Sequence, residues 1–455
     1  WECVAKPLEN EEVLPMNEFA NSLKQKLTSL IREMSAEPAH DVKNPGKDFT
    51  RERKLPFETV MQLLVSMGGN SIFKELLDSQ GYDVNTATTS AFIQQRNKIL
   101  PSAVEFLFHQ FTQSYTDIKD YREYRLLAFD GSDLHFATDP ADTQTYFQTQ
   151  PNTKGYNLTH LNAAYDLCNR LYVDAMVQPL RACSEGRALA AMVDRSPIKS
   201  KTIVIADRGY EGYNNFAHMQ RKGWNYIIRV KDLDSTGILS GLRLPTGGEF
   251  DVVVQVTLTK KQTNEVKAHP EIYTFIPSKN TFDFLDLHEN LFDPISFRVV
   301  RFALPNGTYE SVITNLSAAD FPPDELKSIY NMRWGIETSF RALKYTVGLT
   351  NFHAKRQESI TQEIFARLIM YNFAEMMTSH VVISQMDKRH QYQVNFTIAV
   401  HVCRHFLRSP DDEPPPDVEA LIRKNILPIR PIRQGQKNTR KISNKSAVSF
   451  VYRVA

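Results

Sequence analysis

Two short apolar runs that each end in an aspartate constrain the fold of this chain more than any other feature. The run YRLLAFD, residues 124–130, ends at Asp130, and KTIVIAD, residues 201–207, ends at Asp207. Apolar runs of this length are typical of buried strands. Because side chains at the ends of such strands emerge at one edge of a sheet, we expect the two carboxylates to share a site.

The segments around these runs predict a mixed α/β unit. LTHLNAAYDL and RLYVDAMVQPL, which follow the first run, have the pattern of two strands joined by a short turn, and SEGRALAAMVDR has the pattern of a helix. A helix that ends near Gly223 and the strand WNYIIRV follow the second run. This order places Asp130 on the first strand and Asp207 on the fourth.

Changes of pattern divide the 455 residues into five segments. They are a helical region at 1–120, the first part of the α/β domain at 121–230, a β-rich insertion at 231–323, further helices at 324–410, and a Pro-rich break with a basic tail at 411–455. For the first segment, a DNA-binding domain and a plain helical bundle are both open interpretations.

A third acid is needed to complete the expected site. Two carboxylates brought together repel each other unless a cation or a proton intervenes. A hard divalent ion such as Mg²⁺ prefers oxygen ligands and typically binds one or two carboxylates together with substrate phosphates. Glu337, in the helical segment YNMRWGIETSFRALK, is the candidate for the third ligand.

The neighbours of Glu337 predict contacts to phosphates. At about 100° per residue, Tyr330, Arg333, Glu337 and Lys344 fall within an arc of about 60° on one helix face. The alternative is an ordinary surface ion pair between Arg333 and Glu337, worth only a few tenths of a kcal/mol. Trp334 is either a stacking platform for a DNA base or a core aromatic residue.

At these residues the sequence resembles a DDE transposase of the insertion-sequence-four family. The similarity covers roughly residues 50–455 and rests on LLAFDGSDLHF, HLNAAYDLCNRLYVDAMVQPLR, IVIADRGYEGYNNF and YNMRWGIETSFRALK. The last segment has the Tyr-Arg-Glu-Lys signature of that family. The resemblance implies a ribonuclease-H-like catalytic domain interrupted by a β-rich insertion, with an N-terminal helical domain and C-terminal helices.

The resemblance also implies a reaction and its partners. Asp130, Asp207 and Glu337 would hold two Mg²⁺ ions, for which Mn²⁺ can substitute, and the attacking group would be water and then the 3′-hydroxyl of the element. Tyr330, Arg333, Lys344 and Trp334 would contact DNA. The partners would be the terminal inverted repeats and the target DNA, bound by a homodimer associated with the bacterial nucleoid in the cytoplasm.

The charge distribution supports a nucleic-acid arm only in part. The net charge is +2, yet residues 421–455 carry nine Lys and Arg and no acid. Such a tail is either a DNA-binding arm or a solvated end. Four widely spaced cysteines favour a reducing compartment without a zinc module, and neither a membrane span nor a secretory signal is evident. Because the chain opens on Trp1, we expect either a fragment or a true start at Met16.

One departure from the family pattern concerns the β-rich insertion. Relatives that cleave through a DNA hairpin use a tryptophan there to hold a flipped base, and this insertion has none. The candidate substitutes are Tyr273, Phe275, Phe282 and Phe284. Two other interpretations remain open: a transposase-derived DNA-binding protein without catalysis, and a metal-dependent hydrolase on a similar fold. Asp133 and His135, close to Asp130, are expected to have supporting or structural roles.

Overall fold

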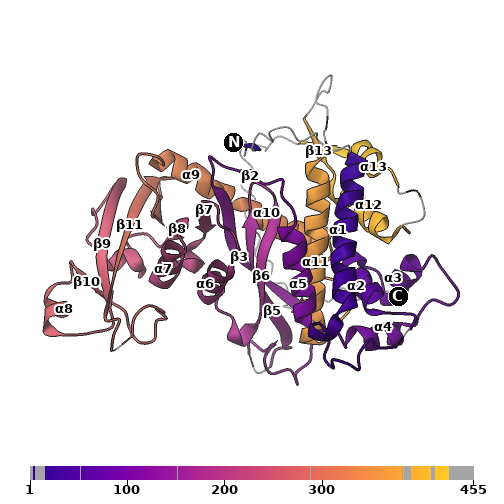
Figure 1. Cartoon of the computed structure of the whole chain (residues 1–455). Helices are drawn as coiled ribbons and strands as arrows, with labels where there is room; N and C mark the ends of the chain where they lie inside the picture. Colours follow the sequence, from indigo (N-terminus) through magenta and orange to yellow (C-terminus); the bar gives the residue numbers. More distant parts are fainter. Residues whose placement is uncertain are drawn as a thin grey trace.

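The fold of the described residues is mixed α/β, with a large mixed sheet beside a helical bundle (Figure 1). The computed structural model describes residues 4–5, 16–51, 53–150, 152–286, 288–381, 383, 391–410, 414 and 416–429. Within this part of the chain, no helix is long and apolar enough to cross a membrane. The basic tail from residue 430 onward lies outside the described residues.

Five strands form the centre of the sheet, in the order β6-β5-β3-β7-β8. The antiparallel part consists of β6 (Leu171–Pro179), β5 (Tyr156–Asp166) and β3 (Arg125–Phe136), and the short strand β4 (Tyr146–Phe147) also pairs with β5. The parallel part continues from β3 through β7 (Thr202–Ala206) to β8 (Asn225–Val230). The predicted strand order is therefore present.

The β-rich segment extends this sheet rather than standing apart from it. Its strands are β9 (Phe250–Thr259), β10 (Tyr273–Phe275), β11 (Phe292–Ala303) and β12 (Tyr309–Thr314). The last of them, β12, pairs antiparallel with β8, so the hydrogen-bonded ladder runs without a break from β5 to β10. The short helix α8 (Asn264–Ala268) lies at the far end of the extension (Figure 1).

Alternation along β3 assigns each face of the sheet to a set of helices. Leu127 and Phe129 share a core with α6 (Glu185–Arg195) and α7 (Tyr213–Arg221). Leu126 packs with α9 (Pro323–Met332), and Ala128 belongs to the core that includes α10 (Trp334–Arg341). Because side chains alternate along a strand, an even-numbered residue that follows Ala128 faces α9 and α10.

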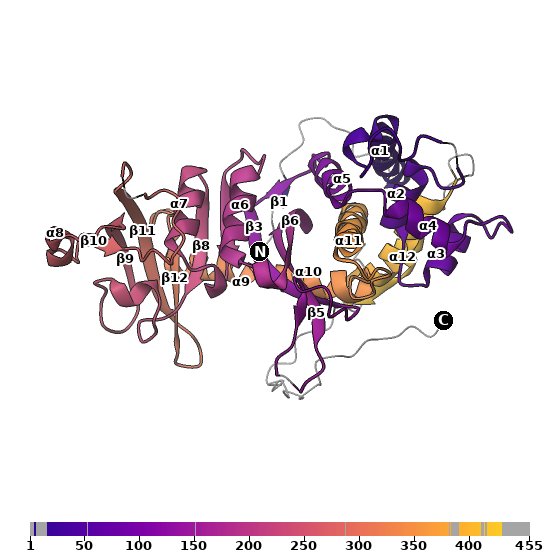
Figure 2. The same ribbon diagram turned by 90° about the horizontal axis from the view of Figure 1, so that it is seen from below.

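The N-terminal and C-terminal helices form one bundle around α11 (Gln357–Ser379), which is buried along nearly its whole length (Figure 2). Most of its buried residues are apolar, as expected of a helix that packs on all sides. Its ion pair with Arg96, at 2.7 Å from Nη1 to Glu363 Oε1, is also buried. The other helices are α1 (Met16–Ala36), α2 (Phe57–Ser66), α3 (Ile72–Ser79), α4 (Thr89–Arg96), α5 (Pro101–Gln113), α12 (Phe396–Arg408) and α13 (Val418–Lys424).

Candidate active site

Asp130 and Asp207 lie next to each other on adjacent parallel strands. The last paired residues of β3 and β7 are Phe129 and Ala206, and each aspartate is the next residue along its strand direction. β3 continues to Phe136, so Asp130 lies within this strand rather than at its end, at the point where pairing with β7 stops. By alternation both side chains face the helices α9 and α10.

Glu337 approaches from that side on α10. Arg333 lies at the junction between α9 and α10, where its Nη2 atom is 2.8 Å from Glu337 Oε1. Arg333 is only 6% exposed and its guanidinium lies 5.7 Å and 5.5 Å from the ring centres of Tyr330 and Trp334. The predicted Arg333–Glu337 pair therefore exists, but the arginine is buried, so the pair is not the surface ion pair of the alternative interpretation.

The three carboxylates and Arg333 act on one another electrostatically. Burial raises the pKa of Asp130, and the charges of Asp207 and Glu337 raise it further, whereas the Gly131 N–H and the Arg333 charge lower it, leaving a pKa of about 6. Asp130 Oδ1 accepts a hydrogen bond of 2.8 Å from Gly131 N, and Asp207 Oδ1 accepts one of 2.7 Å from Gly209 N. Excess negative charge therefore accumulates at this edge of the sheet.

This donor set suits a hard divalent cation. The charges of Asp207 and Glu337 disfavour the ionised form of Asp130, and a cation placed among the three carboxylates would stabilise that form. No three His, Cys, Asp or Glu side chains in the described part of the chain stand close enough together to hold a single ion. A site for two ions does not need such a cluster, because each ion can bind only some of the three carboxylates.

Lys344 completes the positive side of the site, although not by regular helical geometry. The α-helix gives way to a π-helical turn over Ala342–Thr346, so the assumed 100° per residue does not hold as far as Lys344. Its Nζ donates a hydrogen bond of 3.1 Å to the backbone oxygen of Asp133 on β3. Burial lowers the pKa of Lys344, while the charges of Asp133 and Asp130 oppose this effect.

The two aromatic residues of the segment have opposite environments. Trp334 is 60% exposed, so its interpretation as a core residue is wrong. Tyr330 is only 4% exposed and packs with Leu326 and Ile329. Burial raises the pKa of its hydroxyl, and the charge of Arg333 lowers it. Trp334 is therefore exposed to a ligand, whereas the buried ring of Tyr330 packs against the Arg333 guanidinium.

The chain matches the family described as "Transposase DDE domain" over residues 121–373, which is more than half of its length. The chain belongs to the DDE transposase family. No curated protein sequence matches it. Among solved structures, a piggyBac transposase synaptic complex with hairpin DNA is similar at 11% sequence identity, with a TM-score of 0.47, covering 90% of this chain and 81% of that chain.

His160 and Glu185, which the sequence did not predict as site residues, lie close to the backbone beside the two aspartates. His160 on β5 lies opposite Asp133 in the β3–β5 register, and its Nδ1 is 2.7 Å from Asp133 Oδ1. The other ring nitrogen, Nε2, is 3.4 Å from Oε1 of Glu185, the first residue of α6. No local spacing links these residues, because strand pairing and the packing of α6 bring them together. The supporting role expected of Asp133 stays a prediction, to which these contacts give a structural basis.

A polar pocket of about 630 Å³ opens beside the Asp207 turn of the DDE domain. Four cations line it, none in an ion pair with a described residue, and two of them, Arg208 and Lys279, also make no side-chain hydrogen bond to the described residues. The insertion contributes Phe275 and Phe282 to the lining. Of the aromatic residues weighed as substitutes for tryptophan, these two line the pocket, while Phe284 stacks on Arg221, with 3.5 Å from the guanidinium to the ring centre.

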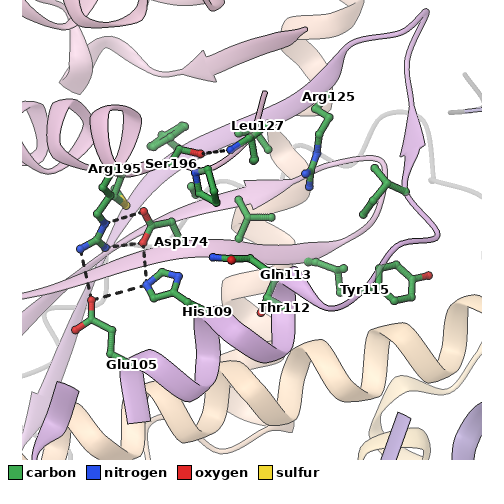
Figure 3. Close-up of a pocket in the computed structure, with 18 of the residues that line it drawn as sticks. Glu105, His109, Thr112, Gln113, Tyr115, Arg125, Leu127, Asp174, Arg195 and Ser196 are labelled. Carbon is green, nitrogen blue, oxygen red and sulfur yellow. Dashed lines mark hydrogen bonds and ion pairs between the residues drawn. The ribbon is translucent and has the colours of Figure 1, made fainter. Parts of the chain in front are cut away.

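A second cavity, of about 580 Å³, is not part of this site. Leu127 and Phe129 line it, so it opens on the face of the sheet opposite to Asp130. At its rim Arg195 pairs with Asp174 at 2.5 Å and with Glu105 at 3.5 Å, so the charges there are satisfied within the protein (Figure 3).

Proposed function

We propose that this chain is a DNA transposase that cuts DNA at the ends of a mobile element and joins the ends to a target. The observation that carries the proposal is the placement of Asp130, Asp207 and Glu337 within a matched DDE domain, with the charges of the other two acids raising the pKa of Asp130. The strand order, three antiparallel and two parallel, supports a ribonuclease-H-like domain. The Tyr-Arg-Glu-Lys signature supports membership of the insertion-sequence-four group.

In this proposal the three carboxylates bind two Mg²⁺ ions, with Mn²⁺ as a substitute. Such a pair of ions, when bound, activates the attacking oxygen and stabilises the leaving oxygen of an in-line displacement. Arg333 orients Glu337 through their ion pair and offers its remaining N–H groups to a phosphate. Lys344 binds a neighbouring phosphate, and Trp334 stacks on a base. Tyr330 completes the DNA-binding set through its contact with Arg333.

A basic pocket in the helical bundle supports DNA as the partner. Lys98 and the loop between α1 and α2 line a pocket of about 330 Å³. On that loop the side chains of Lys47, Arg51 and Arg53 make no ion pair with any described acid. Unpaired cations gathered around a polar pocket suit the phosphate backbone, which dominates the affinity of proteins for DNA. We therefore assign the bundle a role in binding DNA. The proposal further includes a homodimer that acts at the bacterial nucleoid in the cytoplasm.

The test is cleavage of duplex DNA that carries the ends flanking the gene, with and without Mg²⁺. Asp130→Ala, Asp207→Ala and Glu337→Ala should each abolish cleavage while DNA binding persists. DNA binding without any metal-dependent cleavage by the unaltered protein would support the alternative of a catalytically inactive DNA-binding protein. Equal cleavage of DNA with unrelated ends would support a less specific nuclease. Near-normal cleavage by any one variant would remove that residue from the metal site.

A further inference from the structure

One carboxylate packs against both glycines that hold the catalytic aspartates. The N–H groups of Gly131 and Gly209 donate to Asp130 and Asp207 respectively. Glu185 Oε1 lies 2.7 Å from the position that a Cβ at Gly131 would occupy, and Glu185 Oε2 lies 2.8 Å from the corresponding position at Gly209. The two oxygens of a single side chain therefore span the backbone beside both aspartates, within strand β3 at Gly131 and in the turn after β7 at Gly209.

His160 fixes this carboxylate in place. His160 is 8% exposed, and its Nε2 is fully buried without a hydrogen-bond partner in the described part of the chain. That atom lies 3.4 Å from Glu185 Oε1, and a Cβ at Gly131 would collide with it. Burial lowers the pKa of His160, but the two nearby carboxylates, Asp133 at 2.7 Å and Glu185 at 3.4 Å, outweigh this effect and raise the pKa to about 9. The imidazole is therefore a cation at neutral pH, held between two acids.

The two glycines are explained by space and not by backbone conformation. Neither has a backbone angle in the left-handed region, so any residue could adopt their conformation. A side chain at Gly131 would collide with His160 and Glu185, and one at Gly209 would collide with Glu185. Both positions are small because Glu185 and His160 occupy the space beside them.

We propose that Glu185, held by His160, is a positioning residue that sets the separation between Asp130 and Asp207 and so tunes their affinity for divalent metal. This inference rests on the proposed metal-dependent function and extends it. Gly131 and Glu185 lie on the α6 face of the sheet, while Asp130 points to the α10 face. Glu185 therefore acts on the metal site through the backbone at the two glycines, as a wedge behind it.

The first experiment compares Glu185→Ala with Glu185→Gln. Metal affinity is measured directly from the binding of Mn²⁺ to the DNA-free protein, and separately from the Mg²⁺ concentration that gives half-maximal cleavage. Groups that orient metal ligands typically contribute about tenfold to hundredfold in affinity. We expect Glu185→Ala to weaken Mn²⁺ binding by about tenfold or more, and Glu185→Gln, which keeps the shape, to stay within about threefold of the unaltered protein.

The matched control is Glu265→Ala, an exposed glutamate in the first turn of α8, far along the insertion. It should leave Mn²⁺ binding and DNA affinity unchanged. Equal losses in Glu185→Ala and Glu185→Gln would show that the charge matters and not the packing, and would overturn the positioning role. Unchanged Mn²⁺ binding in Glu185→Ala would overturn it as well.

A second experiment uses the space that Glu185 occupies. Gly209→Ala alone adds a methyl group where Glu185 Oε2 stands 2.8 Å away. Combined with Glu185→Ala, the same methyl group has room, so the two substitutions should be less damaging to Mn²⁺ affinity together than their separate effects predict. Strict additivity would contradict the wedge. If the unaltered protein binds Mn²⁺ but never cleaves DNA, the proposed function fails while this inference is still decided by the binding data.

Discussion

Replacing Asp130 by asparagine should make the metal-free protein more stable. Folding raises the pKa of Asp130 from its ordinary value of 3.8 to about 6, chiefly by burial and then by the charges of Asp207 and Glu337. The ionised carboxylate therefore destabilises the folded state. At 1.36 kcal/mol for each tenfold change in proton affinity, the penalty is about 3 kcal/mol. Asparagine keeps the shape and can still accept the hydrogen bond from Gly131 N.

The sign of the pH dependence follows from the raised pKa. Above about pH 6 Asp130 is ionised in both the folded and the unfolded state, so the full penalty applies and Asp130→Asn gains up to about 3 kcal/mol. Below about pH 4 the carboxyl group is protonated in both states, and the variant and the unaltered protein should have equal stability. Between these limits the gain should shrink steadily as the pH falls through 6.

The assay is urea unfolding of both proteins at pH 7.5, 6 and 4.5, with a chelator present. Saturating Mg²⁺ should close the gap at pH 7.5, because only the unaltered protein has its full set of ligands and binding stabilises the folded state. Asp286→Asn is a control with the opposite sign, since N–H groups of His288 and Glu289 lower the pKa of Asp286 to about 2. It should destabilise the protein at pH 7.5. A loss of stability in Asp130→Asn at pH 7.5 would refute the reasoning.

Three further outcomes test the DNA contacts. Arg333→Ala should slow cleavage about tenfold to hundredfold, because a charge-assisted hydrogen bond is lost. It should also shift the pH profile of cleavage to higher pH, because Arg333 lowers the pKa of Asp130. Arg333→Lys should restore this pH profile but not the full rate. Trp334→Ala should weaken end binding in an anisotropy titration by about 1–3 kcal/mol and leave urea unfolding unchanged; equal affinity would exclude stacking. Removing residues 430–455 takes away seven Lys and Arg and should flatten the salt dependence of DNA binding; an unchanged slope would make the tail a bystander.

The sequence predicted the parts of the site that depend on local pattern. Asp130 and Asp207 follow apolar runs whose strand character is plain, and parallel neighbours in register bring them together. Glu337 could be predicted because the segment that contains it has the recognisable Tyr-Arg-Glu-Lys signature. Glu185 and His160 could not be predicted in this way, because the start of α6 and strand β5 meet only after the β3–β5 register and the packing of α6 are fixed.

Regular periodicity was also a poor guide where the backbone departs from it. The junction at Arg333 and the π-helical turn around Lys344 change the direction of each side chain, so a projection at 100° per residue could not place Lys344. The aromatic character of Trp334 favours a core position, yet its side chain is exposed, because Ile336 and Phe340 form the buried apolar face of α10. The joining of the insertion to β8 depends on a strand pairing that has no signal in either strand alone.

The central place of α11 has a consequence for how the chain is made. Helices α1, α2 and α5 bury apolar side chains against α11, which begins more than 240 residues after α5 ends. At a synthesis rate of 5–20 residues per second, the ribosome needs roughly 10–50 s to produce that partner after α5 has emerged. During this interval the apolar surface of the first helices stays exposed unless a chaperone or transient contacts among these helices cover it. An interrupted translation product that lacks α11 should therefore be degraded or aggregate, and not persist as a free DNA-binding fragment.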